Sequence, residues 1–245
     1  MSDRFDRLVP AVVLSLAIAF AGAAIGRGIM QFRTADRFVS VKGVSEREVK
    51  ADLALWPLQL SAADDDLTRA QSRITDGVRR TMAFLAAQGL DTSQVQLQVL
   101  RVTDRNANPY QPAGQQGSRF IIGQTIILRS TEPEKVVAAS QRLGELVAAG
   151  VVLSSGPEYG ATGPTLLFTK LNEIKPAMIA EATARAREAA EQFARDAKSR
   201  VGGIRQANQG VFVILPRDQA PGVSEEGQIT KTVRVVATVD YFLKD

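Results

Sequence analysis

The sequence predicts an α+β protein in which helices cover mainly antiparallel sheet, preceded by an N-terminal transmembrane helix. Three observations support this fold class. The first apolar segment is long enough to span a bilayer. Behind it, segments with apolar residues at every second position alternate with segments whose apolar residues recur every three or four positions. Their order, β-β-α-β-β-α-β-α-β-β, favours helices on one face of antiparallel sheets.

An uncharged segment of nineteen residues runs from Leu8 to Gly26. As a helix it would span about 28 Å, close to the thickness of the hydrocarbon core. This length favours a retained anchor, whereas the arginines ahead of it and the small residues at 21–23 are also typical of a cleaved signal peptide. Residues 1–36 are therefore assigned to tail, anchor and linker, and residues 37–245 to a soluble domain. The anchor residues are Leu8, Val12, Leu16, Phe20 and Ile25.

Charge bias does not fix the orientation of this segment. Two arginines precede it, and three arginines and Lys42 follow it, which nominally favours a cytoplasmic C-terminal domain. The arrangement of basic residues directly ahead of an apolar run instead favours export.

The first half of the soluble part predicts four strands around one helix. Residues 38–42 and 49–60 form a strand pair, and the apolar phase flips at Trp56-Pro57, which indicates a bulge or an edge position because proline donates no ladder hydrogen bond. A helix is expected from the aspartates at 64–66 to Gly89. Strands follow at 94–102, with Val95, Leu97 and Val99 on one face, and at 119–129, joined by a polar loop.

The second half repeats the alternation of helix and strand. A helix begins at Pro133 and ends at Gly150, and a short strand covers 151–154. The longest periodic segment predicts a helix over 173–201, ended by two glycines, with Phe193 as the largest anchor of its apolar stripe. That stripe comprises Met178, Ala182, Ala186, Ala189, Phe193, Ala197 and Val201. Strands at 211–215 and 229–243 follow, the latter placing Val233, Val235, Ala237, Val239 and Tyr241 on one face.

Composition excludes several classes of site. The chain has no cysteine and no histidine, which removes disulfides, thiolate nucleophiles, zinc sites built on nitrogen or sulfur and every triad with an imidazole base. The formal net charge of +4 reflects a small excess of basic residues rather than a dense basic run. We therefore expect no nucleic-acid partner.

The remaining candidate motifs have simpler structural explanations. The aspartates at 64–66 lack the alternating oxygen ligands of a calcium loop and are expected to cap a helix. Ser154-Ser155 with Lys170 lacks the Ser-x-x-Lys spacing, and the glycines at 160 and 163 lack the lysine of a phosphate loop. The Arg/Glu ladder of the long helix indicates a solvated face or an intersubunit surface. Trp56 is typical of a core or bulge residue, with a binding platform as the alternative.

Three stretches resemble the SIMPL-domain family of bacterial envelope proteins, described as oxidative-stress-defence or immunogenic outer proteins. They are VSVKGVSEREVKADLALWPLQLSA from Val39, EATARAREAAEQFARDAKSRVGGI from Glu181 and ITKTVRVVATVDYFL from Ile229. The family's Gly-x-Gly-like opening is reduced here to Gly43, and its proline-aspartate is Ala51-Asp52. The resemblance implies an envelope location, a two-part α+β domain and, in some members, ring- or cage-like homo-oligomers.

From these observations we expect a non-enzymatic protein tethered to the bacterial inner membrane by a single helix. Its SIMPL-like domain would lie in the periplasm and self-assemble into a ring or cage with a scaffolding role in envelope stress protection. A binding module presenting the polar loops 104–118 and 216–228 is the alternative, and a carboxylate hydrolase is a third reading. Membrane lipid and a second copy are the expected partners, and any other protein partner is unknown. We predict no catalytic residue, cofactor or metal, and name Trp56, Pro57, Phe193 and Tyr241 as structural or assembly residues.

Overall fold

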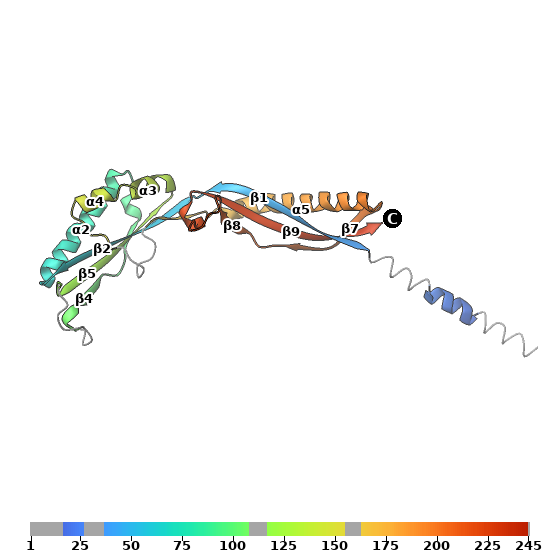
Figure 1. The fold of residues 1–245 in the computed structure, drawn as a ribbon, viewed down its shortest axis with the longest axis horizontal. Coiled ribbons are helices and arrows are strands. Elements are labelled where there is room, and N and C mark those ends of the chain that lie inside the picture. The colour runs from blue at the N-terminus through green and yellow to red at the C-terminus, as the bar shows by residue number, and fades with distance from the viewer. Residues whose placement is uncertain (1–16, 27–36, 108–116, 155–162, 245) are drawn as a thin grey trace, which may run out of the picture. The chain divides into compact units, whose positions relative to one another are not determined.

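The computed structural model describes residues 17–26, 37–107, 117–154 and 163–244 (Figure 1). These residues form antiparallel sheets and helices, as predicted for an α+β protein. The chain divides into two compact units. The first unit contains residues 1–45, 176–212 and 235–245, and the second contains residues 46–175 and 213–234. Each unit is described separately below.

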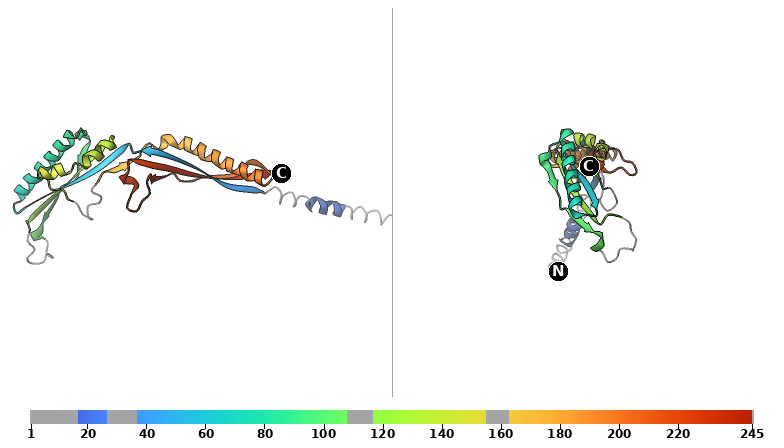
Figure 2. Two further views of the ribbon diagram at one scale, coloured as in Figure 1. Left: turned by 45° about the horizontal axis from the view of Figure 1, so that its top comes forward. Right: turned by 90° about the vertical axis from the view of Figure 1, so that its left-hand side faces the viewer.

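The first unit is a sheet with one long helix against it. Strand β9 (Thr230–Lys244) lies between β1 (Phe38–Lys50) and β7 (Arg200–Gln209), and β7 runs antiparallel to β9. Helix α5 (Leu171–Asp196) lies along this sheet (Figure 2). The predicted buried face of β9 is confirmed, because Val239 and Tyr241 join Val41 of β1 and two alanines of α5 in one apolar cluster.

Helix α5 contacts the sheet through every fourth residue. Its buried side chains are Met178, Ala182, Ala186, Ala190 and Ala194. The predicted stripe is right at Met178, Ala182 and Ala186, and its Ala189 is half-buried against the same cluster. Phe193 is not an anchor, since it is 63% exposed. A four-residue step turns an α-helix about 40° past a full turn, so the buried row winds along the helix as an inclined ridge. Because residues 189 and 190 are both alanine, the sequence does not show which of the two lies in the buried row.

Gly43 explains how close α5 comes to the sheet. A Cβ atom at this position would collide with the carbonyl oxygen of Ala182 and lie 2.5 Å from the backbone nitrogen of Ala186. Such distances are far inside van der Waals contact. The helix backbone thus packs directly on the β1 backbone, and the small residues on both sides are a requirement of the packing.

The second unit is a five-stranded antiparallel sheet with helices on one face (Figure 1). Strands β3 (Val95–Leu97) and β4 (Arg101–Asp104) both pair with β5 (Phe120–Ser130), which pairs along its whole length with β2 (Leu53–Asp64). Strand β6 (Thr165–Leu167) continues the sheet beyond β2.

The helices of the second unit enclose its core. They are α2 (Leu67–Ala87), α3 (Pro133–Ser140) and α4 (Gly144–Ala148), so the single helix predicted from 133 is in fact two short ones. Trp56, Leu58 and Leu60 of β2 form the centre of the apolar cluster beneath them. Strand β8 (Val213–Pro216) pairs with the first residues of β9, and the short turns of 3₁₀ helix are η1 (Thr92–Gln94), η2 (Arg105–Ala107) and η3 (Glu225–Gly227).

The Trp56-Pro57 position is an edge and not a bulge. The register of β2 with β5 continues without a shift from Ala54 to Asp64. On the other side of β2, β6 pairs only as far as Leu55, and backbone bonds to residues 152–154 begin at Gln59. Pro57 lies between these two partners and shares the backbone direction of Gln59, so its missing N–H removes no ladder hydrogen bond among the described residues.

The predicted membrane segment is only partly described. Residues 17–26 are helical and exposed throughout, with the Phe20 side chain 77% exposed and Ile25 also exposed. Leu8, Val12 and Leu16 lie outside the described residues. In the part of the chain that the structure describes, no helix is both long enough and apolar enough to cross a membrane.

Candidate functional site

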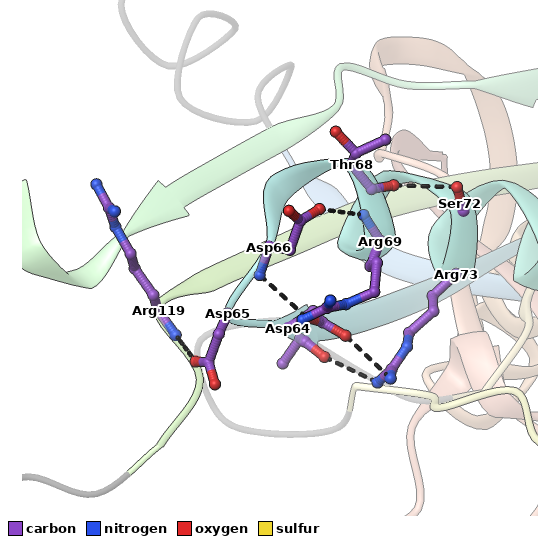
Figure 3. A network of polar contacts seen from close by, with 9 residues as sticks. Asp64, Asp65, Asp66, Thr68, Arg69, Ser72, Arg73 and Arg119 are labelled. Carbon is purple, nitrogen blue, oxygen red and sulfur yellow. Dashed lines mark hydrogen bonds and ion pairs between the residues drawn. The ribbon is translucent and has the colours of Figure 1, made fainter.

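The aspartates at 64–66 form a cap and a clamp at the start of α2 (Figure 3). The Asp66 side chain accepts a hydrogen bond from the Arg69 amide at 2.9 Å, which is the N-cap interaction predicted from the sequence. Asp65 accepts from the Arg119 amide at 2.9 Å and so ties the start of β5 to the end of β2. Asp65 and Asp66 therefore each accept a hydrogen bond from a backbone amide.

Asp64 is the buried member of the cluster. Its carboxylate lies 2.9 Å from the guanidinium groups of both Arg69 and Arg73, and it also accepts from the Asp66 amide at 3.0 Å. The hydrogen bond from Arg69 and that amide bond lower the pKa of Asp64 below its usual value. The pKa of Arg69 is raised in turn by the same contact. Among the residues that the structure describes, no group of three acidic side chains is arranged to hold a metal ion.

A second ion pair holds the base of the neighbouring loop. Arg119 binds the Asp104 carboxylate with both Nε and Nη2, at 3.1 and 2.9 Å, and this pairing lowers the pKa of Asp104. The Arg105 amide donates to the Arg119 carbonyl at 2.9 Å. The two ends of the polar loop predicted at 104–118 are thus fixed, whereas residues 108–116 lie outside the described residues.

Replacing Asp64 by asparagine is expected to lower stability at neutral pH and to flatten its dependence on acid. A carboxylate whose folded-state pKa is depressed contributes stability that is present above its unfolded pKa of about 3.8 and lost as the pH falls through the folded value. The difference in denaturant midpoint between wild type and Asp64→Asn should shrink below about pH 4. Asp76→Asn, which breaks only an exposed pair with Arg79, is the control and should show a smaller difference.

A polar groove lies on the second unit's sheet, over β2, β4 and β5. It has a volume of about 610 Å³. Among its described lining residues only Arg101 is charged, and the hydrogen-bonding side chains around it are Gln59, Ser61, Gln98, Thr103, Gln124, Thr125 and Ser154. The predicted Ser154 candidate therefore joins this groove as a neutral hydroxyl. Ser155 and the glycine at 160 lie outside the described residues.

Apolar side chains remain exposed on β3 and on the segment that follows it. Val99, predicted to share one face of a strand with Val95 and Leu97, is 90% exposed, and Leu97 is also exposed. Only Val95 packs against the core. The strand breaks at residues 98–100, which changes the face that the later side chains occupy.

The named structural residues divide between core and surface. Trp56 and Tyr241 are buried in the cores of the second and first unit respectively, which confirms a core role for Trp56. Pro57 is half-buried at the β2 edge, and Phe193 is exposed on α5. The Arg/Glu ladder of α5 is solvated, with ion pairs Arg185–Glu181 at 2.7 Å and Arg187–Glu191 at 3.1 Å.

Two features of the site were missed from the sequence. Lys231 is fully buried on β9, where its ammonium binds the carboxylate of Glu225 at 2.8 Å and also the Glu225 carbonyl, holding η3 against the sheet. Its alternation with Val233 and Val235 would have placed it on the buried face. Strand β7 was missed because its sequence, RVGGIRQANQ, lacks apolar alternation.

Two comparisons with known proteins bear on identity. No match was found among curated protein sequences. The family model of SIMPL, described as a protein of unknown function (DUF541), matches residues 39–241. That range covers most of both sheets and all of α5, and it includes the first two stretches whole and the third as far as Tyr241. The chain therefore belongs to the SIMPL family.

Proposed function

We propose that this chain is a non-enzymatic envelope protein, tethered to the bacterial inner membrane by a helix over residues 8–26. Its SIMPL domain lies in the periplasm and associates with further copies into a ring or cage that supports the envelope under stress. The observation that carries this proposal is the unpaired edge of β7. The described residues provide no strand on its outer side, since the sheet order is β1-β9-β7.

The β7 edge is suited to pairing with another chain. It is ten residues long, and its residues from Gly203 to Gln209 are exposed. Its later half, residues 206–209, pairs regularly with β9 and carries no charge. An edge of this kind offers unpaired N–H and C=O groups to a further strand.

The other edge of the same sheet, β1, offers a matching partner. Pairing β1 of one copy with β7 of the next joins two different edges, which makes a head-to-tail interface. Such an interface gives a closed ring when the rotation between copies closes. Tethering favours it further, because neighbouring domains on one membrane have a raised effective concentration.

The membrane tether is supported by the exposure of the N-terminal helix. Ile18, Phe20 and Ile25 are all more than half exposed and have no apolar partner among the described residues. Side chains of this kind gain free energy by moving into lipid. Intact mass of membrane-extracted protein should include the N-terminus, and a mature chain beginning near Ala24 would contradict the tether.

Replacing Gln209 by proline should abolish self-association without unfolding the sheet. The Gly210 amide donates to the Val236 carbonyl at 2.8 Å, so by alternation the amides of Ala207 and Gln209 point away from β9. Proline at 209 therefore removes an outward donor and leaves the native ladder intact.

Gln209→Ala is the matched control, because it changes the side chain and keeps the amide. We expect the proline variant to run as a monomer at micromolar concentration and the alanine variant to assemble like wild type. Equal assembly of both variants would show that this edge is not the interface.

A binding module is the second candidate function, and the 610 Å³ polar groove of the second unit supports it. Its neutral amides and hydroxyls suit an uncharged, hydrogen-bonding ligand. The loop at 216–228, named in the same hypothesis, is fixed by Lys231–Glu225 and by the Gln228 side chain bound to the Asp218 backbone. A monomeric wild-type chain would favour this candidate.

A further inference from the structure

Basic side chains gather at one end of the first unit's sheet, where β1 begins and β9 ends. Arg200 of β7 lies directly opposite Lys244 of β9 in the antiparallel register. Two like charges facing each other across a strand pair repel, so this arrangement has a cost in the absence of an anion. Lys198, two residues before Arg200, is exposed and adopts a left-handed backbone conformation with φ of 53°.

Two further arginines belong to the same end. The Leu243 amide donates to the Arg37 carbonyl at 2.8 Å, which places the Arg37 backbone beside the last residues of β9. The Arg205 guanidinium lies 4.0 Å from the ring centre of Phe38, the first residue of β1. We call these five residues the basic end: Arg37, Lys198, Arg200, Arg205 and Lys244.

The basic end has few acidic neighbours among the described residues. Asp196 at the end of α5 is engaged by the Gln192 side chain, and Asp240 lies opposite Gln206. Counted over the described residues alone, five cations and two carboxylates give a net charge of +3, and Asp36, which precedes Arg37, lies outside the described residues. Lys198, Arg200 and Lys244 make no side-chain hydrogen bond or ion pair with the described part of the chain. Asp245 follows Lys244 in the sequence, outside the described residues.

The position of this end along the chain points to its partner. Only the ten residues 27–36 separate the helix that ends at Gly26 from Arg37. Fully extended, this linker spans at most about 40 Å. If the helix is the membrane anchor, the basic end is therefore the part of the sheet that the chain holds nearest to the bilayer.

We propose that the basic end docks on anionic phospholipid head groups of the membrane that holds the anchor. The proposal rests on the proposed membrane tether. A negatively charged leaflet attracts Lys and Arg within a Debye length, and each such residue adds roughly fivefold to the affinity. The exposed Phe38 ring beside Arg205 supplies an apolar contact of the kind found at membrane interfaces. Docking would hold the domain against the bilayer and align neighbouring copies.

The test uses the full chain in lipid nanodiscs and one introduced cysteine. Because the chain has no cysteine, Ala197→Cys beside Lys198 carries a spin label at a single site, and Ala83→Cys on α2 of the second unit is the control. A small fraction of nickel-chelating lipid relaxes a label that lies near the head groups, and the chain has no histidine to bind it. Relaxation is compared in discs of phosphatidylcholine alone and with phosphatidylglycerol added.

We expect several-fold stronger relaxation at position 197 in the anionic discs and no difference at position 83. The triple variant K198N/R200Q/K244Q should lower the ratio of docked to free domain by roughly a hundredfold. The control R79Q/K135Q/R142Q removes the same charge from exposed ion pairs of the second unit and should behave like wild type. Salt at 1 M, where the Debye length is about 3 Å, should remove the difference.

Three outcomes separate the possible failures. Loss of the chain from the discs at 1 M salt would show that the tether itself is wrong. Retention at 1 M salt, together with equal relaxation in both lipids at low salt, would overturn the docking proposal and leave the tether intact. Loss of the lipid effect with inorganic phosphate, but not with chloride at matched ionic strength, would identify a free-anion site instead and also overturn lipid docking.

Discussion

Replacing Gly43 by alanine is expected to destabilise the first unit by about 3 kcal/mol, at the upper end of the usual cost of overpacking. The added Cβ would collide with the backbone of Ala182 and Ala186. A collision with backbone cannot be relieved by a change of rotamer, so α5 must move away from β1. The loss of close packing then extends to Tyr241 and Val239 in the same cluster. Chemical denaturation followed by circular dichroism measures the change.

Gly203→Ala is the matched control for this experiment. Gly203 lies on β7, and a Cβ there would meet no atom within 4 Å. The change should alter stability by less than about 0.5 kcal/mol. If Gly43→Ala were equally harmless, the direct packing of α5 on β1 would be wrong.

Replacing Trp56 by alanine is expected to cost about 4 kcal/mol in the second unit. The indole is fully buried at the centre of the β2, β5 and α2 core, and its removal leaves a cavity larger than the neighbouring side chains can fill. Denaturant unfolding followed by circular dichroism measures the cost, since the variant lacks the chain's one tryptophan.

Trp56→Phe separates packing from hydrogen bonding at this position. The indole Nε1 has no hydrogen-bond partner within the described parts of the chain. Phenylalanine therefore loses part of the volume and no hydrogen bond, and we expect a cost of about 1 kcal/mol. A cost for phenylalanine as large as that for alanine would mean that Nε1 makes a contact essential to the core.

The sequence predicted elements best where one face of an element is apolar. The alternation from Val233 to Tyr241 identified the buried face of β9, and the spacing from Ala70 to Leu85 identified α2. The packing of α5 on β1 depends on close backbone contact, which leaves no pattern of large apolar residues in the sequence. The buried row of α5 is Met178 followed by four alanines, so the large apolar side chain of Phe193 wrongly indicated an anchor where the small Ala190 is buried.

The proposed assembly surface, the edge of β7, was the part of the molecule that the sequence predicted least well. β7 is polar and contains two adjacent glycines. Its only strand partner among the described residues is β9, and the register between the two strands shifts twice near Ile204. Apolar residues at every second position indicate that one face of a strand is buried. An exposed edge strand has no such buried face, so its sequence lacks this pattern. Its position beside β9 is set by long-range pairing that the local sequence does not encode.

The sequence predicted that the aspartates cap α2, but it did not predict their other contacts. Three consecutive aspartates ahead of an apolar helix indicated capping, and Asp66 fills that role. The pairing of Asp64 with Arg69 and Arg73 depends on helical spacing together with the end of β2. The hydrogen bond from the Arg119 amide to Asp65 depends on the β2–β5 register and could not be predicted from the sequence.

The mass of the full chain in mild detergent tests the central claim most directly. Light scattering, corrected for bound detergent, gives the number of 26.4 kDa chains in a particle. The scaffold proposal predicts one discrete mass, a fixed multiple of the chain mass, that persists at micromolar concentration. A mass of a single chain under these conditions would contradict it.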